Sequence, residues 1–175
     1  MGIDPGLAAT GWGVIETAAG RPRYVAGGVI RTSVAAAHTA RLGDIYRRTA
    51  EVARRTAPAL AGVERVFANV NGKSTMALGE ARGAAIAALS ECDIVIAEVS
   101  ALQIKKAVTG AGRADKKQVA GMIPLLLDGA PKKLENDAAD ALACALTVAP
   151  LLRLSRVNEH FRLPPSRPRR RASRR

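Results

Sequence analysis

The chain has 175 residues and a formal net charge of +12, and 48% of its residues are hydrophobic. This length allows one domain with a packed core, and the hydrophobic content favours a globule. No apolar run is long enough to cross a bilayer, no signal peptide is recognised, and two cysteines in apolar surroundings do not make a disulfide framework. We therefore expect a cytoplasmic protein without a membrane partner.

The positive charge is concentrated near the C-terminal end. Residues 151–175 hold nine Arg and one Glu, which contribute +8, whereas residues 1–150 contribute +4. A basic body with a more basic end is typical of a protein that binds a polyanion, most often nucleic acid. We predict a folded domain over residues 1–151 and a basic, disordered arm over residues 152–175.

The first eleven residues, MGIDPGLAATG, predict a hairpin. A short apolar lead ends at Asp4, a Pro5-Gly6 turn follows, and strand-like residues resume at 11–15. A rigid strand end would position Asp4 well for binding a metal ion. A surface turn explains these residues equally well, and GIDPG also resembles the first phosphate-binding hairpin of the actin and Hsp70-like ATPases.

The following stretches predict more strands and a helix. Residues 23–31 read as the third strand of an antiparallel meander. Helical periodicity covers residues 36–57, and Pro58 ends it. Residues 59–67 predict a strand that contains Glu64. A charged side chain in a short apolar strand is costly unless it is paired, exposed or bound to a metal ion.

The second half of the chain predicts alternating helices and strands. Residues 75–90 predict a helix whose glycines and alanines would let another backbone approach, within the chain or across a dimer; Leu78, Ile86 and Leu89 would supply apolar area. Residues 93–99 predict a buried parallel strand.

Two further helices are predicted around a glycine-rich turn at residues 110–113. The first begins near Ser100 and carries Lys105, and the second runs over residues 115–128 and carries Lys116. Basic residues beside such a turn can hold phosphate groups, or they can simply be a solvated run of charge.

The last predicted helix spans residues 134–151 and carries Asp137 and Asp140 near its start. A spacing of three places both carboxylates on one face. They could complement the helix dipole. However, like charges this close repel each other, and burial increases the penalty, so a divalent cation would relieve both problems.

Five motifs occur in an order that resembles the RuvC family of bacterial crossover junction endonucleases over roughly residues 1–150. They are GIDPG at 2–6, VERVF at 63–67, LGEARG at 78–83, QIKKAVTG at 103–110 and DAADALA at 137–143. The resemblance implies an α/β, ribonuclease H-like fold with a mixed five-stranded sheet flanked by helices. Only Met1 precedes the first motif, where family members usually have a few more apolar residues, so we expect a short first strand.

The same resemblance implies an activity and its partners. It implies a homodimer that resolves four-way (Holliday) DNA junctions by paired nicks in recombination and repair, with the junction branch-migration complex as a further partner. The implied catalytic and metal-binding acids are Asp4, Glu64, Asp137 and Asp140. They would bind two Mg²⁺ ions, with Mn²⁺ able to substitute. Two such ions, about 3.5–4 Å apart, activate water and neutralise the leaving oxygen of a phosphodiester.

Four residues are predicted to contact DNA: Arg65, Phe67, Lys105 and Lys116. The two lysines would neutralise phosphates near the acids. Phe67 would stack on a base opened at the crossover, or it is an ordinary core aromatic. Three alternatives stay open: another ribonuclease H-like nuclease, an ATPase for which the chain is short, and a junction-binding protein without catalysis.

Overall fold

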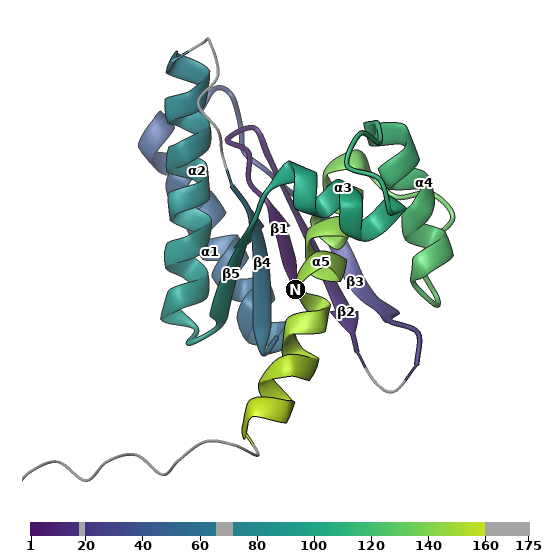
Figure 1. The fold of residues 1–175 in the computed structure, drawn as a ribbon. Coiled ribbons are helices and arrows are strands. Elements are labelled where there is room, and N and C mark those ends of the chain that lie inside the picture. The colour runs from purple at the N-terminus through teal and green to yellow at the C-terminus, as the bar shows by residue number, and fades with distance from the viewer. Residues whose placement is uncertain (18–19, 66–71, 160–175) are drawn as a thin grey trace, which may run out of the picture.

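The computed structural model describes residues 1–17, 20–65 and 72–159. In these residues the chain forms one mixed five-stranded sheet with helices on both faces, which confirms the architecture expected from the sequence (Figure 1). No helix in the described part of the chain is long and apolar enough to span a membrane.

The sheet has the strand order β3-β2-β1-β4-β5. An antiparallel meander is formed by β1 (Gly2–Asp4), β2 (Ala9–Glu16) and β3 (Arg23–Arg31). Parallel pairing then joins β4 (Leu60–Glu64) to β1, and β5 (Val95–Val99) to β4. Parallel neighbours need crossover connections, and helices make them here. The first strand has three residues.

The helices form a layer on each face of the sheet (Figure 1). One face is covered by α1 (His38–Thr56) and α2 (Gly72–Glu91). On the other face lies α5 (Asn136–Glu159), with α3 (Ala101–Thr109) and α4 (Lys116–Leu126) packed against it. The first half of α5 is apolar on nearly all sides, because it is enclosed between the sheet and these two helices.

The strand residues divide between the two faces according to the period of two. Ile3 and Val63 belong to the core shared with α1 and α2, where they pack in one cluster with Ile45 and Leu89. Their neighbours in sequence therefore face α5. On that side β1, β2 and β4 carry glycines rather than large side chains.

Two of these glycines are required by the close approach of α5. A Cβ atom built on Gly11 would lie 1.9 Å from the backbone oxygen of Asp137, and one built on Gly2 would lie 1.9 Å from that of Ala141. No side chain fits in that space, so the helix rests directly on the backbone of the strands. Gly11 is also the register partner of Asp4, so this contact fixes the start of α5 beside the end of β1.

The structure corrects three predicted boundaries. The strand predicted at residues 93–99 is parallel but not buried: it begins at Val95, lies at the edge of the sheet, and leaves Val95 65% exposed. The strand predicted at residues 59–67 ends at Glu64. The last helix continues through Pro150 to Glu159 instead of ending at residue 151. The disordered arm was predicted over residues 152–175, but residues 152–159 belong to α5. Residues 160–175 lie outside the described part, so their disorder stays a prediction.

The prediction that α2 offers Leu78, Ile86 and Leu89 as apolar area to a partner is partly wrong. Leu89 has no exposed surface, and it packs against the sheet in the core of this chain, together with Ala85. The helical period instead leaves Gly79, Gly83 and Ala87 exposed, one turn apart.

Replacing Gly11 with Ala tests the close approach of α5. Because the new methyl group would overlap the backbone of Asp137, we expect the free energy of unfolding to fall by about 3 kcal/mol. Urea unfolding is the measurement. The matched control is Gly121→Ala in α4, where a Cβ atom meets nothing within 4 Å, and it should raise stability by about 0.5–1 kcal/mol. Equal effects of the two changes would contradict the contact.

Candidate active site

Asp4 and Glu64 lie side by side at the carboxyl ends of the neighbouring strands β1 and β4. Their strands are parallel neighbours, and the register pairs Ile3 with Val63, so the next residue of each strand is an acid. The alternation of side chains turns both acids away from the α1 and α2 core and towards α5. The carboxyl ends of parallel strands are where open α/β sheets usually form their sites.

Asp137 and Asp140 come from the start of α5, which lies against the same strand ends. Contact with Gly11 places the backbone of Asp137 beside Asp4. Asp140 follows one turn later, and its side chain is only 19% exposed. Asp140 lines the same cavity as Glu64. Three elements therefore bring four acids towards one place.

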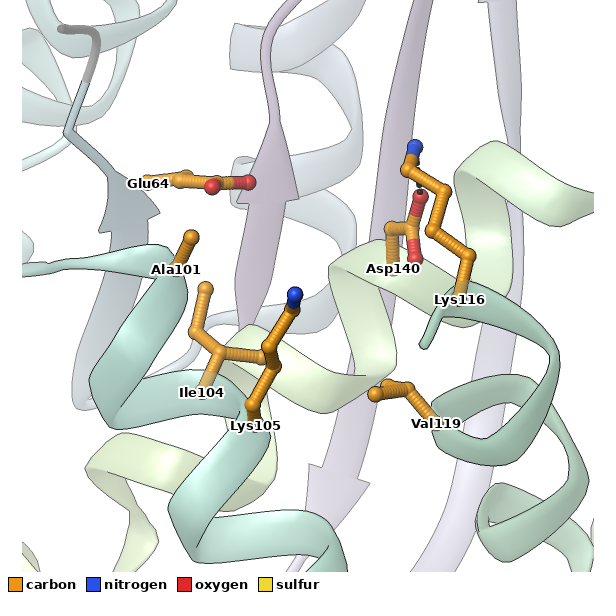
Figure 2. A pocket seen from close by; sticks show the side chains of 7 residues that line it. All are labelled: Glu64, Ala101, Ile104, Lys105, Lys116, Val119 and Asp140. Atoms are coloured by element: carbon orange, nitrogen blue, oxygen red, sulfur yellow. Dashed lines mark hydrogen bonds and ion pairs between the residues drawn. The ribbon is translucent and has the colours of Figure 1, made fainter. Parts of the chain in front are cut away.

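The cavity also has an apolar wall and two lysines. Figure 2 shows Glu64 and Asp140 on opposite sides, with Lys105 reaching up from α3 and Lys116 beside Asp140. Ala101, Ile104 and Val119 supply the apolar wall. The two lysines predicted from the sequence thus lie beside the acids.

Lys116 makes an ion pair with one of the acids. Its Nζ atom lies 3.2 Å from Oδ2 of Asp140. The position of Lys116 is set by a capping box at the start of α4, in which the Asp115 side chain accepts from the N–H of Gln118 at 2.8 Å. The hydrogen bond to Asp140, followed by its charge, raises the pKa of Lys116. Lys116 therefore stays cationic and supplies positive charge to the acids.

The acids disfavour one another's ionised forms. Burial first, and then the charges of Asp140 and Glu64, raise the pKa of Asp4 from 3.8 to about 7. Burial and the charge of Asp140 also raise the pKa of Glu64. A pKa shift caused by neighbouring carboxylates means that the site holds more negative charge than its own cations neutralise.

An oxygen-only set of carboxylates fits Mg²⁺ or Mn²⁺ in ligand type and charge. In residues 1–17, 20–65 and 72–159, however, no three His, Cys, Asp or Glu side chains are already arranged around a single point where an ion could sit. The charges of Glu64, Asp137 and Asp140 all raise the pKa of Asp4, and Lys116 is the cation paired with Asp140. Binding an ion would therefore require the carboxylates to move closer together and Asp140 to exchange its lysine for the metal.

The other two DNA-contact candidates lie apart from this cavity or outside the described residues. Arg65 directly follows Glu64, but its Nε atom lies 4.0 Å from Glu98 on the edge strand β5. Phe67 lies outside the described residues. One contact to the site was missed: Arg82 of α2 donates to the backbone oxygen of Glu64 at 3.1 Å. In the sequence, the one feature that could have pointed to Arg82 is that it is the single arginine in a helix of mostly small residues.

The pKa of Asp4 predicts how stability depends on pH in the presence of EDTA. The folded state holds the proton of Asp4 more tightly than the unfolded chain, where the pKa is about 3.8. The free energy of unfolding should therefore fall as the pH rises from about 4 to about 7, by about 4 kcal/mol from this group. Urea unfolding at several pH values is the measurement.

Asp4→Asn should remove most of that fall, because the amide does not ionise. Asp44→Asn, on the exposed surface of α1, should keep it. A wild-type protein whose stability is flat over this range, or an unchanged slope in Asp4→Asn, would contradict the assigned electrostatics.

Comparison with known proteins identifies relatives over most of the chain. A family model described as crossover junction endodeoxyribonuclease RuvC matches residues 1–148. The crossover junction endodeoxyribonuclease RuvC of Hyphomonas neptunium is 48% identical over 149 residues, which cover 85% of this chain and 89% of that protein. The protein of the same name from Bordetella petrii is 51% identical over 148 residues, which cover 83% and 80%.

Solved structures agree with this result. RuvC of Thermus thermophilus, in complex with a Holliday junction substrate, is 34% identical with a TM-score of 0.80, over 88% of this chain and 94% of that chain. The yeast mitochondrial Holliday junction resolvase is 11% identical with a TM-score of 0.64, over 91% and 81%, and shares the ribonuclease H-like fold alone. The chain therefore belongs to the RuvC family of crossover junction endodeoxyribonucleases.

Proposed function

We propose that this protein is an endodeoxyribonuclease that resolves four-way DNA junctions by paired symmetric nicks during recombination and repair. The observation that carries the proposal is the convergence of Asp4, Glu64, Asp137 and Asp140 at one edge of the sheet. Membership of the RuvC family supports the choice of substrate. A cytoplasmic location and association with the branch-migration complex belong to the same proposal.

The four acids would bind two Mg²⁺ ions, or Mn²⁺ in their place. When bound, such ions supply an activated water and neutralise the leaving 3′ oxygen of the phosphodiester. The chain's own part is to position the carboxylates on two strands and one helix, which hold a site more precisely than loops do. The apolar wall formed by Ile104 and Val119 limits the access of water from that side.

Lys105 and Lys116 would neutralise the phosphate of the bound strand. Both line the cavity with Glu64 and Asp140. Lys116 is 87% exposed although its Nζ atom pairs with Asp140, so it can turn from the carboxylate to a phosphate oxygen without losing packing. This exchange would release Asp140 to the metal when the substrate arrives.

Substrate comparison separates this activity from that of another ribonuclease H-like nuclease, since fold and acids would be common to both. The purified protein is incubated with Mg²⁺ and a four-way junction, a linear duplex or an RNA–DNA hybrid of matched sequence. We expect paired nicks in the junction alone. Cleavage of the hybrid in preference to the junction would refute the proposal.

Replacing each acid by its amide should separate cleavage from binding. We expect Asp4→Asn, Glu64→Gln, Asp137→Asn and Asp140→Asn each to reduce the rate of nicking by about a thousandfold, because several kcal/mol of transition-state stabilisation are lost. Junction binding, measured by fluorescence anisotropy in Ca²⁺, should be retained. Asp128→Asn, which removes an exposed ion pair with Arg21, is the matched control and should cleave normally. Near-normal nicking by Asp140→Asn would remove α5 from the site.

A homodimer would match the two-fold symmetry of the junction, because one patch then serves both subunits and delivers two equivalent cuts. The proposed patch is the exposed line of Gly79, Gly83 and Ala87 on α2, next to Met76, which is 67% exposed. A Cβ atom built on Gly79 or Gly83 meets nothing within 4 Å, so another backbone can approach there.

Gly83→Arg tests this patch. The side chain would project from α2 without a clash inside the subunit, so the protein should fold, while the bulk and charge should block a helix pair. We expect sedimentation at micromolar concentration to give a monomer and paired cutting to be lost. Gly121→Arg on α4 is equally free of contacts and should stay a dimer. A wild-type monomer that makes both cuts in one binding event would contradict the dimer.

A further inference from the structure

We infer that Arg82 is a positioning residue for the acid site: it holds the end of β4, and so directs the Glu64 carboxylate, by replacing a hydrogen bond that the sheet cannot make at Pro5. The inference rests on the proposed function for its effect on cleavage. Its structural part depends only on the register of β1 and β4 and on the contacts of α2 with β4 and β5. In the part of the chain that the structure describes, Arg82 does not line the cavity, and its polar partners are the backbone oxygen of Glu64 and the side chain of Glu98.

The missing hydrogen bond follows from the register of β1 and β4. The N–H of Gly62 donates to the backbone oxygen of Met1 at 2.9 Å, and the paired residues are Gly2 with Gly62 and Ile3 with Val63. In a regular parallel ladder the donors and acceptors then alternate along the pair. The next backbone oxygen of β4 on this side belongs to Glu64, and its donor would be the N–H of residue 5. That residue is Pro5, which has no N–H.

Arg82 supplies a donor at this position. Its Nε atom donates to the backbone oxygen of Glu64 at 3.1 Å, from a side chain that is only 19% exposed. An unpaired carbonyl here would be free to tilt, and the peptide that follows Glu64 would tilt with it. Because the side chain of Glu64 projects from the same residue, the direction of its carboxylate depends on this plane. Pro5, which follows Asp4 at the end of β1, thus leaves the Glu64 carbonyl without a donor from the sheet, and Arg82 of α2 supplies that donor.

Glu98 keeps the guanidinium in place. The Nη2 atom of Arg82 donates to Oε2 of Glu98 at 2.5 Å, and Glu98 pairs in register with Val63 on β4. The planar guanidinium therefore spans a side chain on β5 and a backbone oxygen on β4 with two different nitrogen atoms, and lysine, whose donors all lie on one nitrogen, does not have this fixed planar spacing. The pairing with Arg82 also gives a role to Glu98, the one charged residue of the edge strand β5.

Arg82→Met tests the inference, because methionine keeps much of the apolar stem and removes every donor. Outer partners that orient ligands typically change metal affinity or activity by about 10–100-fold. We expect Mn²⁺ affinity, measured by calorimetry without DNA, to fall at least tenfold, and kcat for a four-way junction to fall similarly with little change in KM. Arg54→Met is the matched control: it also breaks an arginine–glutamate pair, which joins Arg54 of α1 to Glu91 of α2, at a distance from β4.

A spectroscopic readout isolates the peptide concerned. Glu64-Arg65 is the only Glu-Arg pair in the sequence, so protein labelled with ¹³C-carbonyl Glu and ¹⁵N-Arg gives one carbonyl–amide correlation in an NMR spectrum. That correlation should move in Arg82→Met and stay in Arg54→Met. If Arg82 only stabilises the packing of α2, Arg82→Met should lower the free energy of unfolding, as Arg54→Met does, while its Mn²⁺ affinity and kcat equal those of Arg54→Met. That result would overturn the inference.

Arg82→Lys decides the question if Arg82→Met does not fold. A folded Arg82→Lys protein should still lose Mn²⁺ affinity, because the three donors of an ammonium group diverge from one nitrogen and do not reproduce the planar fork that holds the Glu64 carbonyl and Glu98 together. Wild-type affinity and kcat in this variant would overturn the inference. Failure of the proposed function is separate. If the wild-type protein cleaves no junction but its Mn²⁺ affinity depends on Arg82, the activity is wrong and the positioning role stands.

Discussion

The structure depends on one close contact, in which α5 lies directly on the backbone of β1 and β2. The backbone oxygen of Asp137 occupies the space that a side chain at Gly11 would need, and Ala141 does the same at Gly2. This contact places the two carboxylates of an otherwise apolar helix beside the ends of β1 and β4. Without it, Asp137 and Asp140 would lie farther from the sheet, and the pair on α5 would be separated from Asp4 and Glu64 on the strands.

The contact has an electrostatic cost. It brings half-buried carboxylates together, and burial, followed by the charges of Asp140 and Glu64, raises the pKa of Asp4 to about 7. Lys116 neutralises part of the charge at Asp140, but it does so from the surface and by a single ion pair. Functional sites are where folded proteins tolerate such unfavourable local arrangements. The tension is a reason to bind divalent cations, and it gives the metal-free protein a dependence on pH that a purely structural acid pair would lack.

The sequence predicted the parts that follow from local patterns. Local patterns placed Asp4 at the end of a strand, and the spacing of three placed Asp137 and Asp140 on one helical face. They placed Glu64 inside a strand that the structure ends at Glu64. It did not predict that β5 is an edge strand, because a run of apolar residues is the same in a buried or an edge strand. It also missed the role of Arg82, since the need for a donor at Glu64 arises from Pro5, 59 residues earlier, and from the register that joins the two strands.

The central claim is that three elements converge to make one divalent cation site, and Mn²⁺ can locate that site directly. Crystals of the protein grown with Mn²⁺ are measured at the manganese absorption edge, where anomalous scattering identifies the ion. We predict anomalous peaks bound by carboxylates of Asp4, Glu64 and the two aspartates of α5, with Lys116 turned away from Asp140. Ordered manganese held elsewhere on the protein, with Asp140 still paired to Lys116, would contradict the account.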